Sequence, residues 1–355
     1  MTIPAVSTPP SESDREQSLL QVRDLRVVFP TRDGAVQSVD GLTFDVAAGR
    51  TLGIVGESGS GKSVTGQALL GLHTGTRAQI SGSILFEGRD LLALPKQELR
   101  RLRGGGLSMI FQDPMSALHP YYSVGRQIAQ AYRVHHGVSR AAARSRVVDM
   151  LGRVGIANAS RRFDEYPHQY SGGMRQRAMI AMALVNEPRL LIADEPTTAL
   201  DVTVQAQILD LLQDIQLEYG TAIIMITHDL GVVADIADDV MVMYAGKAVE
   251  RGSVDDLFYR AEMPYTWGLL QAMPRAETER RDKLATIPGS PPSMIHPPSG
   301  CPFNPRCEFR SYVAGTACVD QLPLLVGTDP GHTARCHIPP VTRQEIFRNE
   351  VSPNQ

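Results

Sequence analysis

The stretch that decides the fold begins at residue 56 and reads Gly56-Glu57-Ser58-Gly59-Ser60-Gly61-Lys62-Ser63. It fits the pattern G-x-x-x-x-G-K-S/T, follows the β-rich run Thr51 to Val55 and precedes a helical pattern from Val64 to Leu70. Glycines let the backbone fold around phosphate oxygens, so that N–H groups and a helix N-terminus face the anion. Lys62 then reaches the β- and γ-phosphates, and Ser63 offers a hydroxyl to Mg²⁺. The expected phosphate-site residues are Gly56, Ser58, Gly59, Ser60, Gly61, Lys62 and Ser63.

The sequence around this loop alternates short β-rich runs with longer helical patterns from Leu19 to about Gly252, which is typical of a mostly parallel sheet covered by helices. Further strands are expected at Leu25 to Phe29, Ser108 to Phe111, Leu190 to Ala193 and Ala222 to Thr227. Helices are expected at Gln127 to Arg153 and Gly173 to Leu184, within a helical subdomain at about residues 113–186. The expected fold class is α/β, with a P-loop NTPase core.

Length and composition limit the possible classes of protein. The 355 residues suggest about two domains, and 43% hydrophobic with 21% charged residues is the mixture of a globular chain. The net charge of -3 creates no overall positive field toward nucleic acid or anionic lipid. No apolar run approaches the ~20 residues that cross a bilayer, and residues 1–17 show no secretory signal. We expect a cytoplasmic chain with a disordered tail at residues 1–18.

Two carboxylates end the apolar run from Leu190 to Ala193, namely Asp194 and Glu195. The first suits Mg²⁺ coordination, and the second lies where a carboxylate could polarise the water that attacks the γ-phosphate. Alone, such a pair is weak evidence because helix N-termini also use acidic residues. Together with the phosphate loop, it predicts nucleotide hydrolysis.

A second phosphate-binding device is suggested by Ser171-Gly172-Gly173, which opens a helical pattern. The same argument from N–H groups and the helix dipole applies here as at residues 56–63. An ordinary N-cap explains the three residues about equally well.

The composition changes after Met263, where prolines bracket a loop-rich segment that holds every cysteine of the chain. Cys301, Cys307, Cys318 and Cys336 lack the paired C-x-x-C spacing of common zinc sites, and a cytoplasmic location argues against disulfides. Four thiolates could hold either Zn²⁺ or a 4Fe-4S cluster. The neighbouring His332 and His337 are expected to face solvent.

The order of these motifs resembles that of an ABC-transporter ATPase subunit over about residues 19–260. The resemblance rests on the P-loop, Gln112, Ser171-Gly172-Gly173, Asp194-Glu195, Ala199-Leu200-Asp201 and His228. Tyr166-Pro167-His168 and Pro264-Tyr265-Thr266, with Leu269-Leu270, resemble the oligopeptide/dipeptide/nickel importer branch, whose ATPase subunits carry a cysteine-containing C-terminal extension. The resemblance implies an ATPase domain at 19–262 and an extension at 263–355. It also favours a 4Fe-4S cluster over zinc.

Roles for further residues follow from the resemblance. Gln112 would contact Mg²⁺ and the attacking water, and His228 would hold the γ-phosphate. Phe29 would stack on adenine, although a core phenylalanine fits its strand nearly as well. In this family two ATPase subunits pair head to tail, so that Ser171, Gly172 and Gly173 of one subunit meet the ATP of the other. Asp201 would line that seam.

The implied function is that of an ATP-hydrolysing, energy-coupling subunit of a peptide importer at the cytoplasmic face of the membrane. Its expected partners are a homologous ATPase subunit, usually a distinct chain, two membrane-spanning permease subunits and, indirectly, an extracellular substrate-binding protein. A nickel importer of the same mechanism is one alternative. Another is a soluble ABC-type ATPase acting on nucleic acid or ribosomes, but the charge of -3 argues against it and we expect no nucleic-acid partner. The sequence does not name the peptide.

Overall fold

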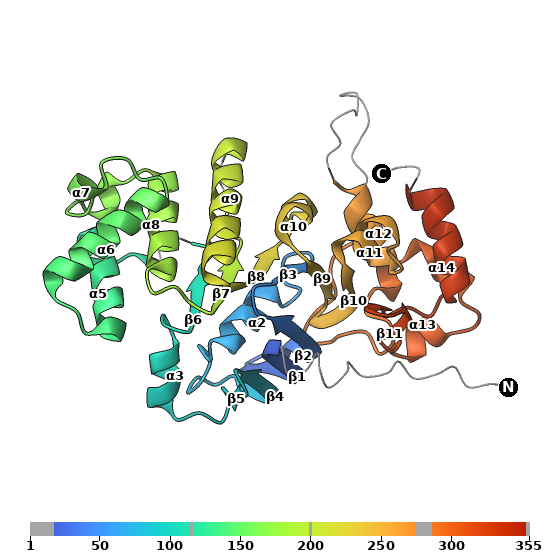
Figure 1. The fold of residues 1–355 in the computed structure, drawn as a ribbon. Helices are drawn as coiled ribbons and strands as arrows, with labels where there is room; N and C mark the ends of the chain where they lie inside the picture. Colours follow the sequence, from blue (N-terminus) through green and yellow to red (C-terminus); the bar gives the residue numbers. More distant parts are fainter. Residues whose placement is uncertain (1–17, 114–116, 199–200, 274–285, 353–355) are drawn as a thin grey trace. The chain divides into compact units, whose positions relative to one another are not determined.

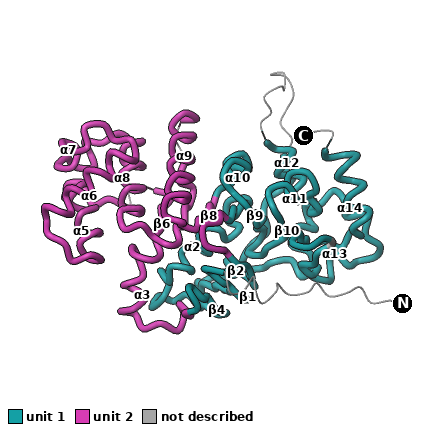
Figure 2. Tube along the Cα trace, viewed as in Figure 1, with its two compact units in different colours: residues 1–45, 52–88, 227–355 teal, residues 46–51, 89–226 magenta. Residues whose placement is uncertain are grey.

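The computed structural model of the chain describes residues 18–113, 117–198, 201–273 and 286–352 (Figure 1). The chain divides into two compact units, which Figure 2 colours separately. The first unit takes in residues 1–45, 52–88 and 227–355, and the second takes in residues 46–51 and 89–226. The tail expected at residues 1–18 lies almost wholly outside the described residues, and the boundaries expected near residues 18 and 263 stay predictions.

The first unit contains strands of two sheets. One set runs in the order β11-β12-β10-β9-β3, with β3 parallel to β9 and the other neighbours antiparallel. In the other set β1 lies between β2 and β4 and pairs antiparallel with β4. The bounds are β1 Ser18–Thr31, β2 Gly34–Ala47, β3 Thr51–Val55, β4 Gln79–Phe86, β9 Asp239–Tyr244, β10 Lys247–Ser253, β11 Val326–Asp329 and β12 His332–Ala334.

The helices of the first unit are short, and in some of them the capping contacts that fix the first turn are clear. Helix α11, for example, begins at Ser253, whose hydroxyl accepts from the N–H of Asp256 while the Asp256 carboxylate accepts from the N–H of Ser253. The bounds are α2 Lys62–Leu69, α10 Leu230–Ile236, α11 Val254–Tyr259, α12 Pro264–Gln271, α13 Ala317–Asp320 and α14 Pro340–Ile346, with the 3-10 turns η2 Asn304–Arg306 and η3 Glu308–Tyr312 and the π-turn η4 Phe347–Val351.

The second unit contains a parallel set of strands in the order β8-β7-β6 and a group of helices. Every residue of β6, β7 and β8 is buried, as expected for strands covered on both faces. The bounds are β5 Arg89–Asp90, β6 Leu107–Ile110, β7 Leu190–Asp194, β8 Ala222–Thr227, α3 Lys96–Leu102, α5 Val124–His136, α6 Arg140–Arg153, α7 Ala159–Arg162, η1 Pro167–Gln169, α8 Gly172–Leu184 and α9 Val202–Tyr219.

The α/β class and the predicted strands are confirmed, but the single helix expected at Gln127 to Arg153 is wrong. The segment forms two helices, α5 and α6, which are separated at Gly137. Gly137 has a φ of 63°, the left-handed conformation in which glycine ends helices at little steric cost. Ser139 then begins α6, because its hydroxyl accepts from the N–H of Ala142.

Residues 263–273 and 286–352, here called the C-terminal region, share one hydrophobic core with strands β3, β9 and β10. Trp267 and Tyr265 of α12 are fully buried in this core, beside Tyr244 of β9 and Phe303. Burial of aromatic side chains of this size contributes strongly to stability. The C-terminal region is therefore packed onto the sheet of the first unit and does not form a separate small core.

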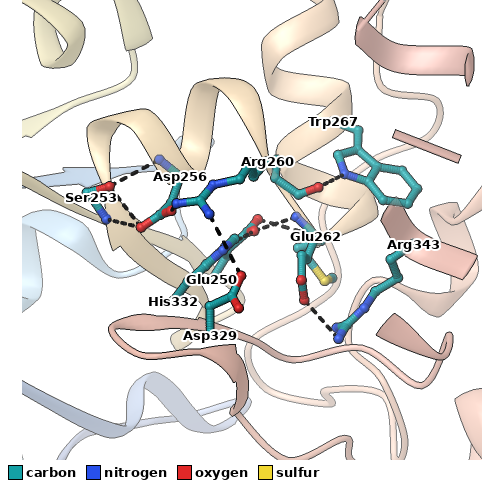
Figure 3. Close-up of polar contacts among 11 residues, drawn as sticks. Glu250, Ser253, Asp256, Arg260, Glu262, Trp267, Asp329, His332 and Arg343 are labelled. Carbon is teal, nitrogen blue, oxygen red and sulfur yellow. Dashed lines mark hydrogen bonds and ion pairs between the residues drawn. The ribbon is translucent and has the colours of Figure 1, made fainter. Parts of the chain in front are cut away.

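A buried carboxylate, Glu250 of β10, organises the start of the C-terminal region (Figure 3). It accepts from the backbone N–H groups of Glu262 (2.5 Å) and Met263 (3.1 Å), directly before α12. Its Oε1 lies 2.8 Å from Nε2 of His332. Glu262 in turn pairs with buried Arg343 of α14 at 2.9 Å. Since an unpaired charge in such a place is costly, these contacts anchor α12, β12 and α14 to β10.

His332 is buried, with 2% of its surface exposed, so the expectation that it faces solvent is wrong. Burial by itself lowers the pKa of His332, but the hydrogen bond and charge of Glu250, with the charges of Glu262 and Asp256, outweigh burial and raise the pKa above the ordinary 6.5. The protonated ring then carries a charge that Glu250 balances.

This pKa shift predicts how stability depends on pH. Because the folded pKa of His332 is raised, its contribution is complete below the unfolded value of 6.5 and is lost as the pH rises through the higher folded value. We expect the free energy of unfolding to fall as the pH rises above 6.5 and through the higher folded pKa of His332, and the fall to be smaller in His332→Gln. Urea unfolding of both proteins checks this, with exposed His296→Gln as the matched control. Equal slopes in the parent and His332→Gln would contradict it.

Candidate functional site

The phosphate loop predicted at residues 56–63 connects β3 to α2 through two tight glycine positions. Gly56 has a φ of 149°, and a Cβ there would lie 2.2 Å from the carbonyl oxygen of Met243. Gly61 has a φ of 101°, and a Cβ there would lie 2.2 Å from the carbonyl oxygen of Ser38. Both backbone contacts leave room for glycine alone. The loop therefore closes tightly over β9 and β2 and leads directly into the N-terminus of α2 at Lys62.

The Lys62 side chain lies inside the curve of this loop. Its Nζ donates to the carbonyl oxygens of Gly56 (2.6 Å) and Glu57 (2.9 Å), and 5% of the residue is exposed. An ammonium group held inside a loop and beside a helix N-terminus creates a positive field for a phosphate chain. Ser63 follows it in the first turn of α2.

The predicted acidic pair, Asp194 and Glu195, lies at the C-terminal end of strand β7 in the second unit. Asp194 is the last residue of β7, is 3% exposed and pairs in register with Ile226 of β8. The next residue, Glu195, has a φ of 49°, a left-handed conformation that is uncommon outside glycine. Its N–H donates to the carbonyl oxygen of Ile226 at 2.8 Å, which holds this backbone in place.

The structure brings two residues predicted for catalysis, Gln112 and Glu195, into direct contact. Nε2 of Gln112, which follows β6, donates to Oε2 of Glu195 at 2.9 Å. The hydroxyl of Thr198 donates to the same oxygen at 2.9 Å. The sequence analysis missed Thr198, although a hydroxyl three residues after a carboxylate in a turn is a recognisable pattern. The result is a half-buried residue whose carboxylate is oriented by an amide and a hydroxyl.

The Ser171-Gly172-Gly173 segment forms the N-terminus of α8. Ser171 is the N-cap, and its hydroxyl accepts from the N–H of Met174 at 3.3 Å. A Cβ added to Gly172 or Gly173 would meet no described heavy atom within 4 Å, so this end of the helix is open. Ser171 and Gly173 line a cavity of about 320 Å³ that is also bordered by Arg162 and Arg177. The positive end of the helix dipole and two guanidinium groups suit an anion here.

The local contacts and exposure of three further predicted site residues, Asp201, His228 and Phe29, are as follows. Asp201 is the N-cap of α9, where its carboxylate accepts from the N–H of Val204 at 2.9 Å, while Ala199 and Leu200 lie outside the described residues. His228 is exposed directly after β8. Phe29 of β1 is half-buried, and its ring meets the edge of His73 with centroids 5.1 Å apart.

The site residues are divided between the two units. The phosphate loop, Phe29 and His228 belong to the first unit. The second unit holds Gln112, Ser171, Gly172, Gly173, Asp194, Glu195 and Asp201. Within each unit, side chains far apart in sequence meet, and the Gln112 and Glu195 pair is the clearest example.

The iron–sulfur cluster predicted at Cys301, Cys307, Cys318 and Cys336 is wrong. Among the described residues, no three His, Cys, Asp or Glu side chains are placed to hold a metal ion together. All four thiols are free, and burial raises the pKa of each, to about 11 at Cys307 and about 12 at Cys336. Cys301 is buried and the other three cysteines are half-buried, and thiols with a raised pKa stay protonated and pack as small apolar groups. Cys301 belongs to the core of the C-terminal region.

Within the ranges that the structure describes, we find no helix with the length and apolar character needed to cross a lipid bilayer.

Two family models match the chain. The ABC transporter model matches residues 39–198, which include the phosphate loop, Gln112 and Glu195. The model of the C-terminal region of oligopeptide/dipeptide transporters matches residues 249–312, which begin beside Glu250.

Curated relatives are similar over most of the chain. The oligopeptide transport ATP-binding protein OppD of Salmonella typhimurium is 53% identical over 90% of this chain and 94% of its own length. OppD of Escherichia coli is 50% identical over 96% and 98%, and OppD of Bacillus subtilis is 51% identical over 83% of each. These relatives are named for ATP binding and oligopeptide transport and none for an iron–sulfur cluster.

Solved structures share the fold. A dimeric ATP-binding cassette in a post-hydrolysis state, bound to ADP and Pi, has a TM-score of 0.61 at 23% identity and covers 66% of this chain and 98% of its own. The cbiO1 protein of Clostridium perfringens, part of an ABC transporter complex, has a TM-score of 0.58 at 31% identity and covers 69% and 92%. From the two family models and the relatives at about 50% identity, we conclude that the chain belongs to the ABC transporter ATP-binding subunits, in the oligopeptide transport branch.

Proposed function

We propose that this protein is the ATP-hydrolysing subunit that powers an importer of di- or oligopeptides. The observation that carries the proposal is the combination, in one chain, of an intact phosphate loop with the C-terminal region of oligopeptide/dipeptide transporters. The protein is an ABC ATPase of the oligopeptide transport type, as its similarity to OppD proteins over most of the chain supports. The nickel and nucleic-acid alternatives have no comparable support.

The phosphate loop supplies the binding site for the triphosphate. The backbone N–H groups of residues 56–61 and the N-terminus of α2 face the β- and γ-phosphates, and Lys62 exchanges its two carbonyl partners for phosphate oxygens. The side chain of Phe29 contacts the adenine ring. Since its ring already lies against His73, the base would stack on an exposed part of a fixed aromatic surface.

Ser63, Gln112 and Asp194 offer a hydroxyl, an amide oxygen and a carboxylate, which are the hard oxygen ligands that suit Mg²⁺. When bound with ATP, Mg²⁺ neutralises charge on the phosphate oxygens. Asp194 is buried at a strand end, where a carboxylate is best kept when a cation compensates it.

Glu195 acts on the attacking water. Gln112 and Thr198 hold its Oε2 and so orient the carboxylate, which accepts a hydrogen bond from the attacking water and polarises that water toward the γ-phosphate. His228 donates to the γ-phosphate and stabilises the charge that develops there.

The site is completed by a second ATPase subunit. Ser171, Gly172 and Gly173 form an open helix end that would close over the ATP held by the partner, and Asp201 would lie at the seam. We expect the partner to be a homologous but different chain, and the pair to drive two permease subunits served by an extracellular substrate-binding protein. The chain would work at the cytoplasmic face of the membrane. ATP would favour the closed pair, and hydrolysis would restore the open one.

Glu195→Gln should abolish turnover without loss of ATP binding, because an amide keeps the shape of the side chain but does not polarise water as a carboxylate does. We expect phosphate release by the assembled complex to fall at least about 100-fold. Glu187→Gln is the matched control, since Glu187 also has a left-handed backbone, with φ 53°, but pairs with Arg146 on the surface. Near-parent phosphate release by Glu195→Gln would remove Glu195 from this role.

Lys62→Ala should weaken ATP binding itself, because it deletes the positive charge that faces the phosphates. We expect the dissociation constant for MgATP to rise at least about tenfold, measured by calorimetry. Lys96→Ala, at an exposed lysine of α3, should leave the constant unchanged. Parent-like affinity in Lys62→Ala would argue against the phosphate-loop assignment.

The purified chain alone should hydrolyse ATP slowly, because each site lacks the serine and glycines of an opposing subunit. Phosphate release should rise when the partner ATPase and permease subunits are added in proteoliposomes, and the rise should accompany uptake of a labelled oligopeptide. A monomer, verified by light scattering, that matches the rate of the complex would refute the shared site. Uptake of nickel in place of peptide would refute the substrate class.

A further inference from the structure

Glu57, the second residue of the phosphate loop, has a partner that the proposed function does not explain. Its carboxylate pairs with both terminal nitrogens of Arg306, Oε2 with Nη1 at 2.6 Å and Oε1 with Nη2 at 3.0 Å. Arg306 lies 249 residues further along the chain, in the turn η2 of the C-terminal region. A bidentate ion pair thus connects the predicted phosphate-binding loop to a segment that is distant in sequence.

Arg306 is held on every side of its guanidinium group. Its side chain is 4% exposed, Nε donates to the carbonyl oxygen of Pro288 at 2.7 Å, and Nη1 donates to the Tyr244 hydroxyl at 3.2 Å. The group also lies over the rings of Tyr244 and Phe303, at 5.8 and 5.9 Å from their centroids. These contacts fix the orientation of the planar guanidinium group, and this orientation determines the position of the Glu57 carboxylate.

The C-terminal region holds the backbone of Glu57 as well. The N–H of Glu57 donates to the hydroxyl oxygen of Tyr265, the fully buried tyrosine of α12, at 2.7 Å. The rings of Tyr244, Tyr265 and Phe303 pack together, with centroids 4.6 to 5.4 Å apart. Glu57 is therefore fixed at two points, its side chain by Arg306 and its N–H by Tyr265.

These two contacts reach the phosphate-binding groups through Glu57. The carbonyl oxygen of Glu57 accepts from Nζ of Lys62 at 2.9 Å and from the N–H of Ser60 at 3.2 Å. A shift of Glu57 would move the carbonyl that guides Lys62 and the N–H groups that follow. Pro291, Pro292 and Met294 line a small pocket together with residues 57–60, so the C-terminal region also packs beside the loop.

We propose that Arg306 is a positioning residue for ATP binding: through Glu57, the C-terminal region holds the phosphate loop in the shape that receives the triphosphate. The inference rests on the proposed function in one respect, namely that ATP binds at residues 56–63. It assigns to the C-terminal region of this subunit an effect on nucleotide affinity, to which the ion pair between Arg306 and Glu57 contributes.

The test compares Arg306→Met, which keeps the stem and removes the charged fork, with Arg306→Lys and Glu57→Gln in the full chain. We expect the dissociation constant for MgATP to rise about tenfold in Arg306→Met and Glu57→Gln, a loss of about 1.4 kcal/mol. Arg306→Lys should restore only part of the affinity, because an ammonium group does not match both carboxylate oxygens. The double variant should be no more than about twofold weaker than either single variant, because both remove the same pair.

Two further measurements distinguish a positioning role of Arg306 from a role in stability alone. In the assembled complex, KM for ATP should rise about tenfold in Arg306→Met while kcat changes less than about threefold, since the groups that act on the water are untouched. The matched control is Arg335→Met, at a half-buried arginine of the same region that donates to the carbonyls of Ala248 and Pro323. It should lose stability, measured by urea unfolding, without loss of affinity.

The outcomes separate this inference from the proposed function. Parent-like ATP affinity in folded Arg306→Met, with Lys62→Ala impaired, overturns the positioning role and leaves the ATP site in place. Parent-like affinity in Lys62→Ala overturns the ATP site itself, and the inference falls with it. If Arg306→Met does not fold, Glu57→Gln decides, because it alters the loop and replaces no residue of the C-terminal region. Full affinity in that variant also overturns the positioning role.

Discussion

The close approach between the phosphate loop and two backbone carbonyls is the constraint on which the phosphate-binding groups depend. Gly56 and Gly61 pass so near to Met243 of β9 and Ser38 of β2 that a Cβ at either place would overlap a carbonyl oxygen. The loop therefore has one available path, and the direction of its N–H groups follows from that path. Lys62 can turn inward because the carbonyls of Gly56 and Glu57 lie where its ammonium group needs partners. A small change in the loop would thus alter both the amide cradle and the lysine.

The second constraint is the buried charge in the C-terminal region. Glu250 has no exposed surface, yet it satisfies two backbone N–H groups and a histidine in a place where an apolar residue would leave those groups unpaired. The cost of burying the carboxylate is offset only if all partners are present, so β10, β12 and the start of α12 must assemble together. These contacts explain how a region rich in proline and turns keeps a defined structure. Its aromatic residues complete the core of the sheet.

Local patterns could be read from the sequence, whereas long-range pairings could not. The phosphate loop, the acidic pair after β7 and the capped start of α8 each depend on a few consecutive residues, and each was predicted with its correct local structure. The contact between Glu57 and Arg306 spans 249 residues, and no pattern in either segment points to the other. The cysteines show the opposite error, because their clustering in sequence suggested a metal site. In the structure Cys301 belongs to an apolar core, and Cys307 and Cys336 pack against that core. The burial of His332 was also missed, because its partner Glu250 is distant in sequence.

The left-handed backbone at Glu195 shows how strain and placement combine at the proposed catalytic carboxylate. A non-glycine residue in this conformation costs of order 1–3 kcal/mol, so surrounding contacts must impose it. Three do so: the N–H bond to Ile226, and the amide of Gln112 and the hydroxyl of Thr198 on one carboxylate oxygen. Because Ile226 belongs to β8 and Gln112 follows β6, the carboxylate takes its position from both strands that flank β7. Any movement of one strand relative to the others would then change the direction of the carboxylate, and the hydrolysis proposed for Glu195 would depend on the arrangement of all three strands.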